Sequence, residues 1–268
     1  MGGADAEGAG GAGVSESGDS TEHAGVEDES ILTRQAAAPD EIVRYGTLPD
    51  QFAEVRHGAR EAAASRPLLM LLHGGFWRPA YDLRHMSPLA VALAVEGWTT
   101  ANVEYRRIPG KPQAGADDLQ CAVRALPDTV SGHNGRVALI GFSAGGHWAL
   151  WLAGKRAPVN AVVALAPVAS LAIARELRLS RDAVGEFLGP EAECWRDWDP
   201  ASLPSSPTPA VILHGDRDLI VPLQVTREYL KSHTSANLHL QAQVGHFSLI
   251  DPQSVVFPAL LSGLLAAT

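Results

Sequence analysis

The sequence predicts a single large α/β domain in which a mainly parallel sheet is covered by helices on both faces. Short runs that are typical of strands alternate along the chain with longer segments of helical periodicity. The chain has 268 residues, of which 46% are hydrophobic, enough for one such domain with a substantial core. We expect this domain to span residues 41–268 and to follow a tail at residues 1–40.

The tail holds most of the chain's net negative charge. Residues 1–41 contain ten acidic residues and one basic residue, whereas residues 42–268 contain 20 of each sign. Because the tail has almost no large apolar side chains, we expect it to be disordered. It also lacks the basic start and the apolar centre of a secretory signal. The balanced body has no basic patch, which argues against a nucleic-acid partner.

The elements of the domain follow in order. Two alternating segments, 41–45 and 51–56, are predicted to open it as antiparallel strands. The further predicted strands are 66–72, 99–105, 136–140, 161–166, 210–214 and 236–243. The predicted helices are 87–96, 114–126, 144–154, 222–232 and a last helix that follows Asp251 and Pro252 and ends near 265. Residues 168–207 break this rhythm with several prolines and two tryptophans, which favours a lid inserted over the sheet.

A serine lies at the sharpest predicted turn of the domain. Residues 141–145 read Gly-Phe-Ser-Ala-Gly, between the strand 136–140 and the helix that begins at 144. A strand, a tight turn of small residues and a helix together expose a nucleophilic serine at the edge of a sheet. Ser143 is therefore the candidate nucleophile.

A serine hydroxyl needs a base within hydrogen-bond reach and a carboxylate that orients this base. His246 follows the last predicted strand and a glycine, and it alone among the ten histidines fits the base. Asp218 follows the strand 210–214 and can turn toward the loop of His246. Asp216 competes for this role, but it lies closer to the strand and better suits a turn cap. All of these residues follow strand ends, where open α/β sheets place their sites.

The negative charge of an acyl-transfer transition state needs backbone N–H donors. The run His73-Gly-Gly-Phe-Trp77 follows the strand 66–72, and its glycines let N–H groups point inward. We predict that Gly75 or Phe76 donates together with Ala144, the residue after the nucleophile, and that His73 holds the loop. Trp77 and Trp148 are candidates for an apolar substrate pocket, with core packing as the alternative for each.

These motifs resemble the α/β-hydrolase superfamily and, within it, kynurenine formamidase-like enzymes and related short-chain carboxylesterases. The matching stretches are H-G-G-F-W at 73–77, N-V-E-Y-R at 102–106, G-F-S-A-G-G-H at 141–147, H-G-D-R-D at 214–218 with V-P at 221–222, and G-H-F at 245–247. The resemblance covers about residues 42–268. It implies a triad of Ser143, Asp218 and His246 and an oxyanion hole of Gly75, Phe76 and Ala144. Residues 168–207 depart from the pattern, so the resemblance does not identify the substrate.

The leading prediction is a carboxylesterase that cleaves small esters through an acyl-serine intermediate. The alternative is an arylformamidase that cleaves N-formyl aryl amines, since the same groups would serve both reactions. A non-catalytic binding module on the same fold is a third hypothesis, but such a protein would normally lack a triad member. No metal or organic cofactor is implied, because H-E-x-x-H, C-x-x-C and Walker patterns are absent.

The setting is predicted from the cysteines and from the hydropathy of the chain. Two cysteines without metal-like spacing favour a reduced, cytoplasmic protein. No apolar run approaches the length of a membrane span, so we expect no membrane partner. The expected partner is the small-molecule ester or formamide substrate of the predicted reaction.

Overall fold

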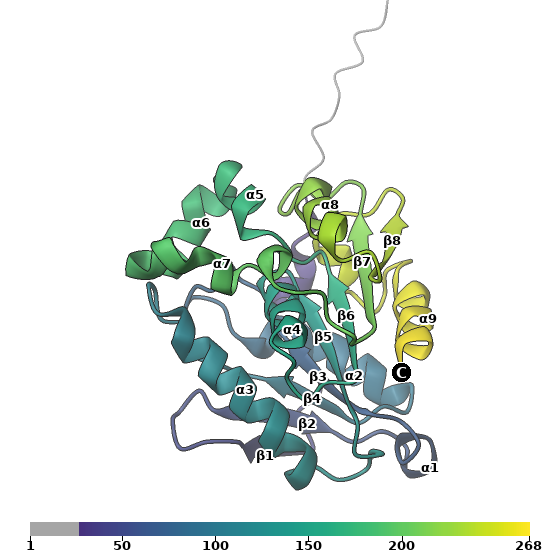
Figure 1. The fold of residues 1–268 in the computed structure, drawn as a ribbon. Helices are drawn as coiled ribbons and strands as arrows, with labels where there is room; N and C mark the ends of the chain where they lie inside the picture. The colour runs from purple at the N-terminus through teal and green to yellow at the C-terminus, as the bar shows by residue number, and fades with distance from the viewer. Residues whose placement is uncertain (1–26) are drawn as a thin grey trace, which may run out of the picture.

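A computed structural model describes residues 27–268 as one eight-stranded sheet with helices on both faces (Figure 1). The strands lie in the order β1-β2-β4-β3-β5-β6-β7-β8. They are β1 (Glu41–Arg44), β2 (Phe52–Arg56), β3 (Leu68–Leu72), β4 (Thr100–Val103), β5 (Val137–Phe142), β6 (Ala161–Leu165), β7 (Ala210–Gly215) and β8 (Asn237–Gln241). Strand β2 pairs antiparallel with β1 and β4, and every pair from β4 to β8 is parallel. The mainly parallel sheet is thereby confirmed.

The helices divide the core into two halves, one on each face of the sheet. They are α1 (Arg60–Ala63), α2 (Ser87–Val95), α3 (Pro112–Thr129), α4 (Ala144–Gly154), α5 (Leu171–Glu176), α6 (Leu179–Leu188), α7 (Trp195–Trp198), α8 (Leu223–Ser232) and α9 (Phe257–Ala267). Short 3₁₀ turns are η1 (Ser30–Thr33), η2 (Leu83–Met86), η3 (Gly189–Cys194), η4 (Pro200–Ser202) and η5 (Phe247–Leu249). Alternate residues of β3 point to opposite faces, so Met70 belongs to the core half that includes residues of α3, α4 and α8, and Leu71 to the half that includes residues of α2 and α9. Burial on both faces explains why β3 reads as a continuous apolar run.

The domain begins earlier than the sequence predicts. Residues 1–26, most of the predicted disordered tail, lie outside the described residues. Residues 27–40, by contrast, pack onto the domain, which corrects the expected boundary at residue 41. Ile31 of η1 is 1% exposed and joins the core half that contains α2 and α9. A single isoleucine in a polar segment gives no periodic signal, so the sequence did not reveal this contact.

The last helix also begins later than predicted, at Phe257 instead of just after Pro252. The intervening residues form a turn in which Asp251 accepts hydrogen bonds from the backbone N–H groups of Gln253 and Ser254. Asp251 thus caps a turn and does not start the helix.

Residues 168–207 form α5, α6 and α7, which lie together at one end of the molecule beside α8 (Figure 1). Within residues 27–268 no helix is both long enough and apolar enough to span a bilayer.

Candidate active site

Ser143 lies in a strained turn between β5 and α4. Its φ of 56° and ψ of −115° lie in a region that non-glycine residues rarely adopt, at a cost of about 1–3 kcal/mol. The turn is held by its backbone, since Ser143 N–H donates to Leu165 O at 2.8 Å and Ser143 O accepts from Val168 N at 3.1 Å. The turn also needs Gly145, because a Cβ there would lie 1.9 Å from Leu72 O. A strained serine fixed from several sides matches a nucleophile elbow.

Asp218 and His246 meet at the carboxyl ends of β7 and β8. The Nδ1 atom of His246 lies 2.7 Å from Oδ2 of Asp218, and both side chains are buried. The other carboxylate oxygen of Asp218 accepts from the backbone N–H groups of Ile220 and Val221, at 2.9 and 2.7 Å. Backbone N–H groups therefore hold Oδ1 of Asp218, while its Oδ2 orients the imidazole of His246.

Asp216 has the capping role that the sequence suggested. Its Oδ1 accepts from Gln243 N–H at 2.7 Å, which ties the loop after β7 to the turn after β8. His214 is a neighbour that the sequence analysis missed. It lies between Thr226 Oγ1 and Val221 O, at 2.9 and 2.8 Å, and its Nε2 is 3.5 Å from Asp218 Oδ2. Burial lowers the pKa of His214 although the charge of Asp218 opposes this shift, so His214 supports the loop as a neutral ring.

Ser143 and His246 line the same cavity of about 190 Å³. Its other lining residues are Glu29, Leu32, Gly75, Phe76, Tyr81, His85, Phe142, Ser180, Ile220 and Phe247. The ring of Phe142 packs against that of His246 with centroids 4.6 Å apart. No hydrogen bond among the described residues engages Ser143 Oγ, so this hydroxyl is free to turn toward the imidazole. In proteins without substrate, catalytic hydrogen bonds are often open and close in the complex.

The loop after β3 brings two of the predicted oxyanion donors to this cavity. Gly75, Phe76 and Trp77 all have positive φ, of 112°, 49° and 58°. This backbone path places Gly75 and Phe76 in the cavity wall. No hydrogen bond between residues of the described range 27–268 uses the N–H group of Gly75, Phe76 or Ala144. Ala144 is also the first residue of α4, where the helix dipole favours negative charge.

His73 fixes the start of this loop in the protein interior, as predicted. It is fully buried, its ring stacks on Tyr105 with centroids 4.4 Å apart, and its carbonyl accepts from the Tyr105 hydroxyl at 2.8 Å. Its Nε2 lies 3.2 Å from Oε1 of Glu104, which also pairs with Arg107. Burial alone would raise the pKa of Glu104, but the hydrogen bond from His73 and the charges of His73 and Arg107 together lower it. A charged Glu104 thus anchors His73.

Trp77 and Trp148 do not line the cavity beside Ser143, which corrects their assignment to the substrate pocket. Trp77 is 5% exposed and stacks on Phe187 of α6, and Trp148 is 1% exposed. Trp77 Nε1–H donates to Nδ1 of His147 at 3.3 Å, and His147 Nε2 lies 2.8 Å from Trp198 O. Burial lowers the pKa of His147 to about 3, although the hydrogen bond to Trp198 favours the protonated form. The rings of Trp77, His147 and Trp148 therefore belong to the core, where they pack residues 168–207 against α4.

Part of the predicted lid segment reaches the cavity. Ser180 lines it, and Arg78 of the loop after β3 holds Ser180 in place. The Arg78 guanidinium donates to Oγ and O of Ser180 at 2.6 and 2.7 Å and to Glu186 Oε2 at 2.8 Å. Ser180, Arg181 and Asp182 all have positive φ, so α6 starts with a distorted turn. No sequence pattern indicates such a turn.

Comparison with known proteins places these observations in a family. The BD-FAE family model matches residues 57–233, about two thirds of the chain. Esterase LipC of Mycobacterium tuberculosis is 26% identical over 236 residues, which are 77% of this chain and 57% of LipC. The chain thus spans little more than half of that relative's length.

Solved structures of esterases share the fold. Esterase B from Lactobacillus rhamnosis superposes with a TM-score of 0.71 at 18% identity, covering 87% of this chain and 88% of that one. Thermogutta terrifontis esterase 2 phosphonylated by sarin gives a TM-score of 0.65 at 19% identity, with 85% and 92% covered. The predicted α/β-hydrolase fold is thereby confirmed. The chain belongs to the BD-FAE family.

Proposed function

We propose that this protein is a serine carboxylesterase that hydrolyses small carboxylic esters through an acyl-serine intermediate. The observation that carries the proposal is the His246–Asp218 pair, 2.7 Å apart, whose imidazole lines the same cavity as Ser143 on its strained turn. The similarity to Esterase LipC supports ester hydrolysis.

The proposed reaction assigns one role to each group. Ser143 Oγ attacks the ester carbonyl while Nε2 of His246 takes the hydroxyl proton, and Asp218 stabilises the resulting imidazolium. The carbonyl oxygen becomes an oxyanion held by the N–H of Ala144 and that of Gly75 or Phe76. When the tetrahedral intermediate collapses, His246 protonates the leaving alcohol. Water then attacks the acyl-serine with His246 again as base, which releases the acid and restores Ser143.

The cavity walls favour an apolar substrate. Five of the twelve lining residues are large and apolar, namely Leu32, Phe76, Phe142, Ile220 and Phe247, and a space of about 190 Å³ suits a small acyl or aryl group. The esterase relative favours an ester over the formamide of the alternative hypothesis. A reducing compartment such as the cytoplasm stays a prediction, supported by Cys121 and Cys194 being free thiols.

Turnover of p-nitrophenyl acetate and of N-formylkynurenine by the wild type and by Ser143→Ala tests the proposal. We expect the ester to be the better substrate and Ser143→Ala to lower its kcat by roughly 10⁴- to 10⁶-fold. Ser248→Ala is the matched control, because Ser248 lies two residues from His246 but does not line the cavity. Near-normal ester turnover by Ser143→Ala would refute the proposal, and preference for the formamide would favour the alternative.

A further inference from the structure

The segment before β1 contributes to the wall of the candidate active site. We call residues 27–34 the N-terminal strap. Glu29 and Leu32 of the strap line the cavity that holds Ser143 and His246. Part of this cavity wall therefore comes from residues that precede the sheet.

The strap is attached directly to the loops that carry the proposed triad. The carboxylate of Glu27 accepts from His246 N–H at 2.8 Å and from Leu219 N–H at 2.9 Å. Gly245 leaves room for this contact, since a Cβ there would lie 2.3 Å from Glu27 Oε2. One side chain thus bridges the loop of the base and the loop of its carboxylate, Asp218.

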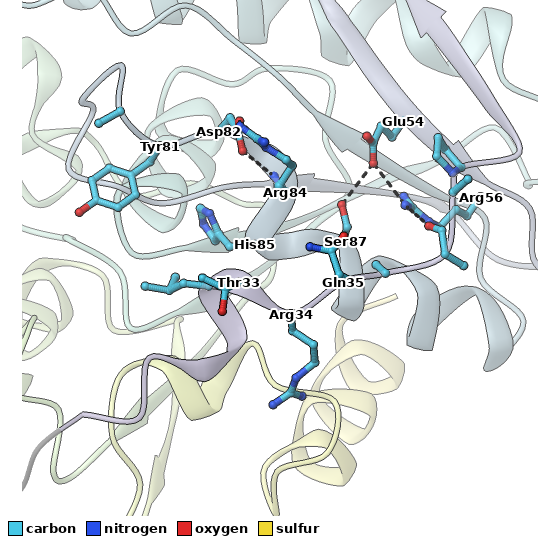
Figure 2. Close-up of a pocket in the computed structure, with 16 residues that line it drawn as sticks. Thr33, Arg34, Gln35, Glu54, Arg56, Tyr81, Asp82, Arg84, His85 and Ser87 are labelled. Carbon is cyan, nitrogen blue, oxygen red and sulfur yellow. Dashed lines mark hydrogen bonds and ion pairs between the residues drawn. The ribbon is translucent and has the colours of Figure 1, made fainter.

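Two further contacts fix the strap, one at its other end and one in its middle. Arg34 donates to both carboxylate oxygens of Asp251, at 2.5 and 2.9 Å. Figure 2 shows the Arg34 side chain extending away from the neighbouring groove, toward the C-terminal part of the chain. Ile31, between the two anchors, is buried in the core. A bidentate arginine pair and a buried apolar anchor hold the strap in one position.

The strap also lines a second, larger space beside the cavity. This groove of about 510 Å³ lies between residues 32–39 and the region of η2 and α2, and it shares Leu32, Tyr81 and His85 with the cavity (Figure 2). Its acidic side chains are paired, Glu54 with Arg56 and Asp82 with Arg84. The groove therefore adds no uncompensated acidic charge beside the cavity.

Glu29 differs from these paired carboxylates. Among the described residues that line the cavity, it is the only acidic one, and none is Lys or Arg. No hydrogen bond or ion pair within the described chain engages its carboxylate. His85 also lines the cavity, but burial lowers its pKa to about 3, so this ring is neutral at pH 7 and adds no positive charge. The cavity wall thus carries one uncompensated negative charge.

We propose that the N-terminal strap is a specificity element of this active site, in which Glu29 disfavours anionic substrates. The inference rests on the proposed ester hydrolysis. Glu29 is exposed, so its carboxylate is solvated and its repulsion of a second negative charge in the cavity is moderate, whereas a neutral substrate is unaffected. Glu29 selects among substrates and takes no part in the chemical step.

Pairs of esters of similar size, one neutral and one anionic, test this role. For the acyl side, the pair is p-nitrophenyl butyrate and mono-p-nitrophenyl succinate. For the alcohol side, it is methyl 4-acetoxybenzoate and 4-acetoxybenzoate. We expect Glu29→Gln to raise kcat/KM for the anionic member of at least one pair by about threefold to tenfold relative to its neutral partner, and high salt to reduce this gain.

Asp28→Asn is the matched control. It removes the same charge one position away, keeps an acceptor for Ser30 N–H, and does not line the cavity. The proposal is overturned if the ratio of kcat/KM for the anionic ester to that for the neutral ester is unchanged in Glu29→Gln, or if it changes equally in Asp28→Asn. In either case, turnover of the neutral esters would still support the proposed hydrolase function. If the wild type hydrolyses none of these esters, the proposed function fails and the specificity role fails with it.

Discussion

Asp218 and Asp216 provide a discriminating test of the proposed triad, because the two carboxylates lie two residues apart and have different partners. In Asp218→Asn, the amide oxygen can keep the two backbone N–H bonds from Ile220 and Val221. The amide NH₂ then faces His246 Nδ1, where the carboxylate oxygen lies at 2.7 Å in the wild type. The imidazole must accept at Nδ1 and carry its proton on Nε2, so it cannot take the proton of Ser143.

The magnitude follows from this wrong tautomer. An Asp-to-Asn change at a triad carboxylate lowers kcat by about 10⁴-fold, or about 5.4 kcal/mol of transition-state stabilisation. In Asp216→Asn, the amide oxygen still accepts from Gln243 N–H, so kcat should stay within about threefold and stability within about 1 kcal/mol of wild type. Steady-state hydrolysis of p-nitrophenyl acetate measures the first effect, and urea unfolding the second. Equal losses of kcat in the two variants, with both folded, would refute the assignment of Asp218.

Two further predictions concern stability. Gly145→Ala places a Cβ 1.9 Å from Leu72 O and should lower the free energy of unfolding by about 3 kcal/mol or more. In Gly263→Ala the added Cβ would meet only side chains, Val211 at 3.2 Å and Leu213 at 3.6 Å, so the free energy of unfolding should change by less than about 1 kcal/mol. Urea unfolding compares the two variants, and similar values would contradict the packing argument. Burial lowers the pKa of His147 and of His85 to about 3, whereas the pKa of a histidine in the unfolded chain is about 6.5. Between these two pH values the unfolded state binds more protons than the folded state, so the free energy of unfolding decreases as the pH falls. Each histidine should contribute a slope of about 1.4 kcal/mol per pH unit to the free energy of unfolding, measured with urea between pH 5.5 and 4.5. His147→Gln should remove one of these two contributions. A free energy of unfolding that does not change over this pH range would show that the two rings are not kept neutral.

The sequence predicted the sheet and the three proposed catalytic residues because their signals are local. The strand–turn–helix order around Ser143 and the positions of Asp218 and His246 after strands can be read within about ten residues each. The capping role of Asp216 was also predictable, from its position close to β7.

The cavity walls could not be predicted in the same way. Glu29, Leu32 and Ser180 reach the cavity only because the N-terminal strap and the segment 168–207 fold back over the sheet, which no local pattern encodes. The tryptophans were placed wrongly for a related reason. Three successive positive φ values in the loop after β3 put Phe76 into the cavity wall and bury Trp77, and a sequence does not specify which of two adjacent aromatic residues faces the cavity.

The proposed reaction requires Ser143 to be a nucleophile that is activated by His246. Reaction with a fluorophosphonate probe, followed by peptide mass spectrometry, tests this most directly, with Ser143→Ala and His246→Ala as comparison variants. We predict one label per chain on Ser143, slow labelling in His246→Ala and none in Ser143→Ala. Labelling at another serine, or an unlabelled but folded wild-type protein, would contradict the account and favour a binding module on this fold.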